Sequence, residues 1–180
     1  LEQLFWPELI VVGGGVSKRS EKFLPLIDIR TALVPAKLLN NAGIVVAGPI
    51  ETVSPDSWRK QLEVNVIGQF AVTQAVLPRL RESRGRVVFI SSVNGRIATP
   101  MLGPYSASKF ALEAAADALR VELKGWGIPV VLIEPAQTDT DMWQTAADMV
   151  LETEAAMSPE HRELYAKHIA GMKKFVPTVR

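Results

Sequence analysis

The stretch Gly85–Gly95, GRVVFISSVNG, contains the segment that decides the fold. A short apolar run rich in β-branched residues is followed at once by two serines, and then by an asparagine and a glycine. An apolar run without polar alternation is typical of a buried strand in a parallel sheet. Ligands of α/β proteins bind at the carboxyl ends of such strands. The stretch therefore predicts a strand that ends in a functional site.

Helical patterns flank this strand on both sides. Upstream, a long helix is expected to begin at Ser54, the N-cap, with Pro55 at its first helical position. Pro78 is expected to kink or end that helix. Downstream, the alanine-rich stretch Tyr105–Gly127 predicts a second helix that ends at its last glycines, and residues 128–136, IPVVLIEPA, predict a second buried strand. Helices alternating with apolar strands predict an α/β fold with a doubly wound parallel sheet.

The composition excludes several classes of function. The 180 residues are 48% hydrophobic and 22% charged, enough for one domain with a core. Twenty basic residues against 19 acidic ones leave a net charge of +1, so neither a nucleic acid nor an anionic membrane is an expected partner. With no cysteine and only His161 and His168 as histidines, no metal site is expected, and the location is predicted to be cytoplasmic. No apolar run reaches the roughly 18–20 residues of a membrane span.

Tyr105 and Lys109 form a candidate catalytic pair within the motif YSASK. Residues four apart on a helix lie on the same face, so the phenol and the ammonium are expected side by side. A free tyrosine has a pKa near about 10, and a neighbouring cation favours its charged form. Ser92, at the adjacent strand end, is suited to donate a hydrogen bond to the same substrate oxygen. From spacing alone the alternative stays open that Tyr105 packs in an interface and Lys109 is solvated.

Five features of the sequence occur in a fixed order and spacing: NNAG at 40–43, Asn65 in NVIG, Ser92 in ISSVNG, Tyr105 thirteen residues after Ser92, and Lys109. Together they resemble the short-chain dehydrogenase/reductase family. The resemblance covers about residues 40–180. It implies an oxidoreductase that uses NAD or NADP on a small-molecule alcohol or ketone. The segments EAAADALRVEL and LIEPAQTDTDMW are similar to those of members that act on lipophilic or secondary alcohols such as retinoids and hydroxysteroids.

The same resemblance implies a role for each site residue. Tyr105 would be the general acid/base, and Ser92 would polarise the substrate carbonyl. Lys109 would lower the pKa of the tyrosine and bind the nicotinamide ribose, while Asn65 would hold a water that relays protons from Lys109. Ala136 stands where the family usually has glycine. The implied cofactor-binding residues are Asn41, Ala42, Gly43, Tyr105, Lys109, Pro135 and Thr140.

The nucleotide-binding half of such a fold has little room ahead of NNAG. Its glycine-rich turn and ribose-binding residue need two βαβ units of about 30 residues each, whereas 39 residues precede Asn40. The glycines Gly13–Gly15 do not form G-x-G-x-x-G. The sequence therefore predicts a partial Rossmann-like doubly wound parallel sheet with its N-terminal nucleotide-binding half truncated or replaced.

Residues 1–47 resemble a different family, the polyphosphate glucokinases of the ROK sugar kinases, in their C-terminal part. VVGGGVSKRSEKFLP and RTALVPAKLLNNAGIV carry this resemblance. The two resemblances overlap at NNAGIV and together predict a composite chain. Its parts would be a kinase-tail-like segment at 1–39 and a dehydrogenase catalytic part at 40–180. We expect impaired oxidoreductase activity, because positioning the hydride donor contributes much of such catalysis.

Two other functions remain open from the sequence. One is a non-catalytic module that oligomerises through its two long helices, by which the family usually forms homodimers and homotetramers. The other is a remnant of a polyphosphate- or ATP-dependent glucokinase. For a dehydrogenase, Met101, Met142 and Trp143 suggest an apolar substrate pocket, and residues 138–174 are expected to form a lid.

Overall fold

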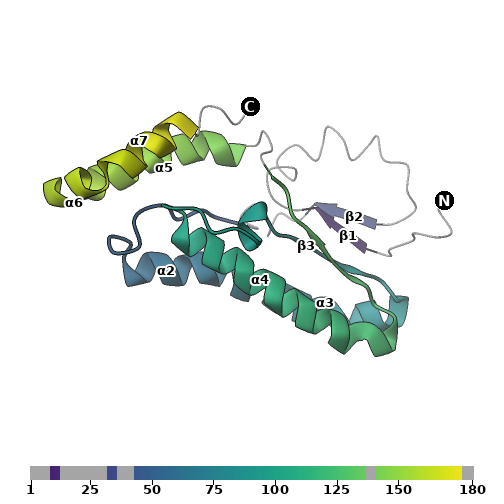
Figure 1. Ribbon diagram of the computed structural model, residues 1–180. Helices are drawn as coiled ribbons and strands as arrows, with labels where there is room; N and C mark the ends of the chain where they lie inside the picture. Colours follow the sequence, from purple (N-terminus) through teal and green to yellow (C-terminus); the bar gives the residue numbers. More distant parts are fainter. Residues whose placement is uncertain (1–8, 13–31, 36–42, 137–140, 176–180) are drawn as a thin grey trace.

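The computed structural model describes residues 9–12, 32–35, 43–136 and 141–175 of the chain (Figure 1). The strands in these ranges form two parallel pairs, β1 with β2 and β3 with β4. The predicted α/β fold with parallel strands is therefore confirmed. The elements are β1 Leu9–Val12, β2 Ala32–Pro35, α2 Pro55–Leu62, the π-helical η5 Glu63–Ile67, α3 Gly68–Ser83, β3 Val87–Ile90, the 3₁₀ turn η6 Val93–Gly95, α4 Gly103–Glu122, the 3₁₀ turn η7 Leu123–Trp126, β4 Val130–Ile133, α5 Asp141–Ala156, α6 Pro159–Leu164 and α7 Ala166–Phe175.

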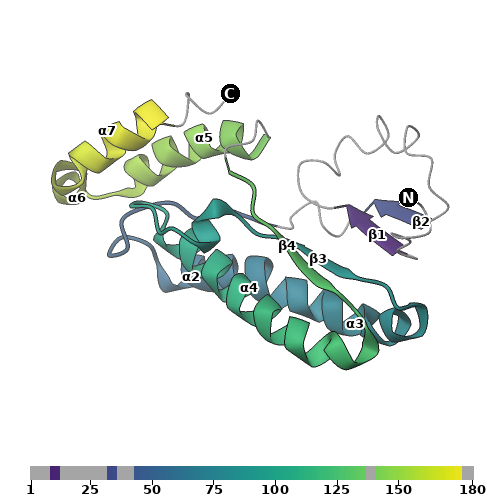
Figure 2. The same ribbon diagram turned by 45° about the vertical axis from the view of Figure 1, so that its right-hand side comes forward.

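Strands β3 and β4, joined by α4, form the βαβ unit that carries the site. Val87 is in register with Val130 and Ile90 with Ile133. The pairing continues beyond the strands, because Ser91 N donates to Ile133 O at 2.7 Å. Helices α3 and α4 lie side by side on one face of this pair (Figure 2).

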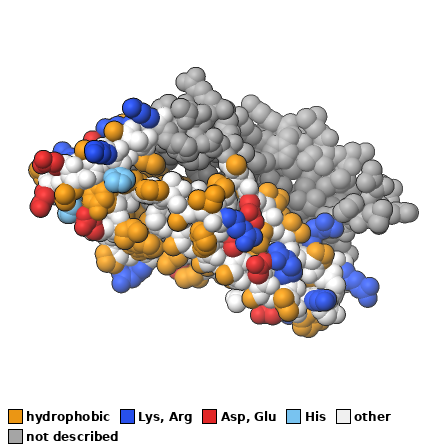
Figure 3. Space-filling view, in the orientation of Figure 1, with side chains coloured by type: hydrophobic (Ala, Val, Ile, Leu, Met, Phe, Trp, Pro, Cys, Tyr) orange, Lys and Arg blue, Asp and Glu red, His pale blue; other side chains and the backbone are white. Residues whose placement is uncertain are grey.

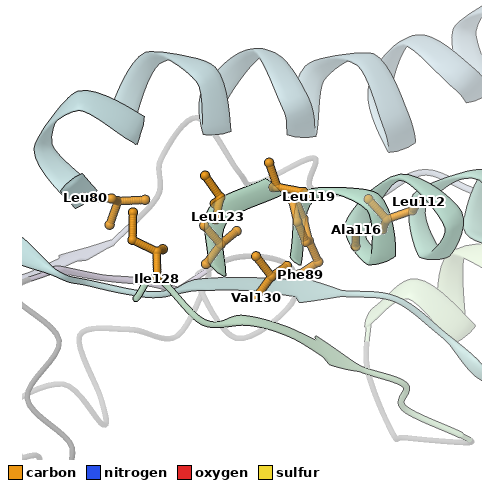
Figure 4. Close-up of a cluster of buried hydrophobic side chains, with 9 residues drawn as sticks. Leu80, Phe89, Leu112, Ala116, Leu119, Leu123, Ile128 and Val130 are labelled. Atoms are coloured by element: carbon orange, nitrogen blue, oxygen red, sulfur yellow. The ribbon is translucent and has the colours of Figure 1, made fainter. Parts of the chain in front are cut away.

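A single apolar cluster joins the two helices to the two strands (Figure 4). Leu112 and Ala116 of α4 are 1% and 0% exposed, and the rings of Phe89 and Phe70 are 5.2 Å apart. Burying one large apolar side chain contributes about 1.5–3 kcal/mol, so this cluster is the main source of stability for the site-bearing unit. Its buried members are Leu80, Val87, Phe89, Leu112, Ala116, Leu119, Leu123, Ile128 and Val130.

The opposite face of β3 and β4 is exposed. Val88 and Ile90 are each 45% exposed, and Val131 and Ile133 are 38% and 46% exposed. We call these four residues the open strip. The sequence predicted buried strands. In the described part of the chain they are buried on one face, where α3 and α4 pack, and alternate residues on the other face are exposed or half-buried.

The helix expected from Ser54 is interrupted by the π-helical turn η5. Ser54 caps it as expected, since its hydroxyl accepts from Ser57 N. The π-helical turn η5 was not predicted. Pro78 does not end the helix, which continues to Ser83; the proline is exposed, so the backbone carbonyl that lacks its N–H partner can bond to water. The end comes at Arg84, whose φ of 53° is left-handed.

Helices α5 and α7 pack against the start of α4 through a second apolar cluster. A new helix begins after Ser158, as the sequence predicted, with Pro159 at its first position. No helix in the described ranges has both the length and the apolar content that crossing a bilayer requires. The buried members of this cluster are Met101, Leu102, Tyr105, Val150, Met157, Ile169 and Met172.

Candidate active site

The carboxyl end of β3 presents two serines to the start of α4. Ser91 and Ser92 are 4% and 8% exposed. The Ser92 hydroxyl accepts from Asn94 N at 3.2 Å and thereby caps η6. The same side chain lies close enough to Tyr105 to lower the pKa of its phenol. The strand end and the YSASK motif therefore meet, as the sequence predicted.

Tyr105 and Lys109 project from the first turns of α4 into this site. They are 7% and 4% exposed, and Lys109 Nζ lies 5.8 Å from the centre of the Tyr105 ring. Lys109 Nζ donates to Ile90 O at 2.9 Å, which ties the helix to the last residue of β3. Both residues are therefore buried at the strand end, and the alternative that Lys109 is a solvated surface charge was wrong.

The pKa of Tyr105 departs from the expected direction. Burial raises the pKa of the phenol above its usual value, and the hydrogen bond with Ser92 opposes that rise. Lys109 is not among the groups that shift this pKa, and the net direction is upward because burial, the larger effect, disfavours the phenolate. In this arrangement Tyr105 holds its proton at neutral pH.

Burial of Lys109 disfavours its charged form. Burial lowers its pKa from 10.5 to about 8, and the charge of Glu113 opposes this. Lys109 therefore remains mostly protonated at neutral pH and titrates within an accessible range.

The free energy of unfolding is expected to rise between about pH 8 and pH 10. In this window the unfolded chain, with an ordinary lysine pKa of 10.5, binds more protons than the folded chain, and stability then increases with pH. The raised pKa of Tyr105 acts in the opposite direction only above pH 10.

Urea unfolding across this pH window measures how the free energy of unfolding changes with pH. Lys109→Met should remove the rise, Lys124→Met at an exposed position should keep it, and equal slopes in parent and Lys109→Met would contradict the expectation.

Asn65 lies in the π-helical turn η5 and is completely buried. Its Oδ1 accepts from Ile44 N at 2.9 Å, and its Nδ2 donates to Ile44 O and to Ser108 Oγ, each at 3.0 Å. The side chain therefore connects the segment at Gly43 and Ile44 to α4. A π-helical turn inside a helix is frequently found at functional sites.

The remaining predicted binding residues are only partly described. A Cβ placed on Gly43 would lie 3.7 Å from Asn65 Oδ1 and 3.9 Å from Lys109 Nζ, so Gly43 borders the site. Pro135 is half-buried, and its carbonyl accepts from Val93 N at 3.0 Å. Asn41, Ala42 and Thr140 lie outside the described residues.

Two buried polar residues near the site were missed from the sequence. Gln61, completely buried, accepts from Val46 N at 2.6 Å and donates to Ile44 O at 2.8 Å. Glu113 is 3% exposed and lies one turn after Lys109. Their spacing could have identified them: Gln61 lies four residues before Asn65, and Glu113 four residues after Lys109, so each shares a helix face with a predicted site residue.

The described residues fit the nicotinamide ribose of the dinucleotide that the resemblance implies. An ammonium has three N–H donors, and within the described part of the chain Lys109 meets one hydrogen-bond acceptor, Ile90 O. Two donors are therefore free for ribose hydroxyls, and the missing side chain of Gly43 leaves space beside them. Gly13–Gly15 lie outside the described residues.

Comparison with known proteins gives relatives for most of the chain. One is the 3-amino-tetrahydro-pyrrolizinone reductase of Xenorhabdus hominickii, 47% identical over 106 residues, which cover 59% of this chain and 37% of the relative. Another is the NADPH-dependent 3-dehydrocapnine reductase of Ornithobacterium rhinotracheale, 47% identical over 114 residues, which cover 61% of this chain and 40% of the relative. The chain thus spans less than half the length of these two curated relatives.

A similar solved structure is a short chain dehydrogenase from Burkholderia cenocepacia in complex with NADP. It superposes with a TM-score of 0.55 at 31% identity, over 59% of this chain and 45% of that one. The family model for short chain dehydrogenases matches residues 36–150, well over half of the sequence. The chain therefore belongs to the short chain dehydrogenase family.

Proposed function

We propose that residues 40–180 are the catalytic part of an oxidoreductase that transfers hydride between NAD or NADP and an alcohol or carbonyl compound. The observation that carries the proposal is the meeting of three side chains at the carboxyl end of β3. Ser92 lies close enough to Tyr105 to lower the pKa of its phenol, and Lys109 is held at the same strand end by Ile90 O. The use of a nicotinamide dinucleotide is supported by a relative named as NADPH-dependent and by a similar solved structure in complex with NADP.

In the proposed reaction Tyr105 moves a proton at the substrate oxygen. The bound nicotinamide supplies or accepts the hydride. Because burial raises the pKa of Tyr105, the phenol is protonated at neutral pH and ready to protonate a carbonyl oxygen as it is reduced. The Ser92 hydroxyl, beside the phenol, donates to the same oxygen.

Lys109 and Asn65 have supporting roles in the proposal. Lys109 binds the nicotinamide ribose through the N–H groups that Ile90 O leaves free. The Asn65 side chain is engaged by Ile44 and Ser108, so the relay water predicted from the family would be held by the backbone of the π-helical turn.

The substrate is proposed to be an apolar alcohol or ketone. Tyr105 belongs to the second apolar cluster, beside Met101 and Leu102, so its immediate surroundings on that side are hydrophobic. Helices α5 and α7 contribute to the same cluster, which agrees with the predicted substrate-covering role of residues 138–174. Met142 and Trp143 belong to α5, but their side chains lie outside the described part.

We also propose that the chain is composite and impaired. The family model begins at residue 36, close to the predicted junction at 39–40, and β1 and β2 precede it. The kinase-tail-like segment at 1–39 remains a proposal that rests on the sequence resemblance alone. Weak cofactor binding and slow turnover follow if this segment does not supply the usual pyrophosphate contacts.

A non-catalytic oligomerising module is the second candidate. Phe110 and Val121 on α4 are 43% and 74% exposed, and Val72 on α3 is 40% exposed. Hydrophobic side chains are also scattered over the face that carries α2 and α4 (Figure 3). A dimer or tetramer formed through these helices would cover such residues. The two candidates differ in whether any turnover depends on Tyr105.

Titration of the purified chain with NADH and NADPH tests the proposed function. Nicotinamide fluorescence is expected to show saturable binding, and Lys109→Ala should weaken it about tenfold or more, because hydrogen bonds from a charged donor are lost. Lys124→Ala, at an exposed lysine, is the matched control and should bind like the parent. Absence of binding to both nucleotides in a folded chain would refute cofactor use by this chain.

A further inference from the structure

Gln61 of α2 is a completely buried amide that the proposed reaction does not use. Its Oε1 accepts from Val46 N at 2.6 Å, and its Nε2 donates to Ile44 O at 2.8 Å. The same Nε2 donates to Ser108 Oγ at 3.4 Å, so the oxygen and both N–H groups of the amide are engaged. Breaking any of these bonds would leave a polar group unpaired away from water. Gln61 therefore holds the backbone at Ile44 and Val46 in place.

Asn65 repeats this pattern one helical turn later. Its Oδ1 accepts from Ile44 N at 2.9 Å, and its Nδ2 donates to Ile44 O at 3.0 Å. A helix advances roughly 6 Å over four residues, and an extended chain advances roughly 6.6 Å over two. Two amides spaced four apart on a helix can therefore bond alternate residues of a neighbouring segment, as an adjacent strand would. We call Gln61 and Asn65 the amide ladder.

The amide ladder also reaches the helix that carries the candidate catalytic pair. Ser108 Oγ accepts from Asn65 Nδ2 at 3.0 Å as well as from Gln61 Nε2. It donates to Tyr105 O at 2.7 Å, and the residue is completely buried. The hydroxyl thereby uses its one donor and both of its acceptor positions. A continuous chain of hydrogen bonds therefore connects Ile44 to the first turn of α4.

The segment held by the amide ladder begins at the proposed cofactor site. Gly43 directly precedes Ile44, and a Cβ placed on Gly43 would lie 3.9 Å from Lys109 Nζ. The space that Gly43 leaves beside the ammonium therefore depends on where the backbone at Ile44 is fixed. In the described part of the chain, two helix side chains fix it: Asn65 bonds Ile44 N, and Gln61 bonds Ile44 O. A shift of this segment would change the room available to the nicotinamide ribose.

We propose that Gln61 is a positioning residue for the cofactor. By holding Val46 N and Ile44 O, it fixes the backbone that leads back into Gly43. It thereby sets the space between that backbone and the Lys109 ammonium. The inference rests on the proposed function for the identity of the ligand, a nicotinamide dinucleotide. The hydrogen bonds of the amide ladder can be measured without cofactor.

The first test is amide hydrogen exchange in the cofactor-free chain, followed residue by residue by NMR. Gln61→Met keeps the length of the side chain and removes its hydrogen-bonding groups, so Val46 N–H should exchange about tenfold faster or more. Ile44 N–H, whose acceptor is Asn65, should keep most of its protection. Gln74→Met, at an exposed glutamine of α3, is the matched control and should leave both rates unchanged. Equal exchange of Val46 N–H in parent and Gln61→Met would overturn the proposal.

The second test, NADPH affinity, separates positioning from stability alone. Gln61→Glu has the shape of the parent side chain, but its hydrogen-bonding groups change with pH. The protonated carboxyl can accept from Val46 N and donate to Ile44 O, whereas the ionised carboxylate has no donor and repels that carbonyl. NADPH binding should therefore weaken about tenfold or more between about pH 6 and pH 9, since burial raises the pKa of a carboxyl into this range. Dividing by the parent affinity at the same pH removes the titration of Lys109.

Gln61→Met should bind NADPH weakly at every pH, and Gln74→Glu should follow the parent. A parent-like NADPH affinity of Gln61→Glu across this range would overturn the positioning role, even if urea unfolding shows that the variant is less stable. If Gln61→Met does not fold, the pH dependence of Gln61→Glu decides. Failure of the parent to bind NADH or NADPH would contradict the proposed function, and the exchange rates would still decide whether Gln61 holds the segment.

Discussion

Replacing Tyr105 with phenylalanine is expected to lower kcat by about 10²–10⁴-fold for any carbonyl compound that the parent reduces. The substitution removes one hydroxyl, the only group of this side chain able to give a proton to the substrate oxygen. The aromatic ring stays in the apolar cluster with Met101 and Leu102, so the fold should survive. Oxidation of NADH or NADPH in the presence of a panel of apolar ketones measures the effect.

Tyr165→Phe is the matched control for this experiment. Tyr165 is the second tyrosine of the chain, and it packs against the same apolar cluster from the C-terminal helices. It should retain parent activity, while circular dichroism confirms that both variants are folded. Turnover in Tyr105→Phe equal to that of the parent would refute the proposed acid/base role.

Replacing Asn65 with alanine is expected to destabilise the chain by about 2–4 kcal/mol. The residue is completely buried and joins Ile44 to Ser108 of α4. Its loss leaves Ile44 N without its side-chain acceptor, whereas Ile44 O keeps a bond from Gln61 Nε2. Urea denaturation, followed by circular dichroism, measures the change in the free energy of unfolding.

Gln74→Ala is the control for the Asn65 substitution, since Gln74 is an exposed amide on the adjoining helix α3. Its change should stay within about 0.5 kcal/mol. A loss in Asn65→Ala no larger than that of the control would mean that the three hydrogen bonds of Asn65 contribute little. Lost turnover with unchanged stability would instead favour the predicted role in proton relay.

The parts of the site that lie close together in sequence were predictable. Tyr105 and Lys109 share a helix face by their spacing alone, and Ser92 follows a strand whose apolar pattern is clear. The roles given to these residues, and the cytoplasmic location, stay predictions. The interactions of Asn65 were not predictable, because its partners Ile44 and Ser108 are 21 and 43 residues away.

The degree to which individual side chains are buried could not be predicted from local sequence patterns. The pKa of Tyr105 depends on how much water the fold removes around it, which spacing to Lys109 does not reveal. Pro78 was expected to kink or end its helix; it does not end α3, because an exposed position lets water replace the lost hydrogen bond. The strands were expected to be buried because their residues are apolar throughout, whereas alternate residues are exposed or half-buried in the described structure.

The open strip on β3 and β4 has a consequence for how the protein behaves in concentrated solution. Four branched aliphatic side chains in register form a flat surface that water solvates poorly. Sulfate and other salts that are excluded from protein surfaces strengthen association between such surfaces. Ammonium sulfate should therefore precipitate this chain readily. For storage, a buffer of low salt concentration without sulfate should keep it in solution.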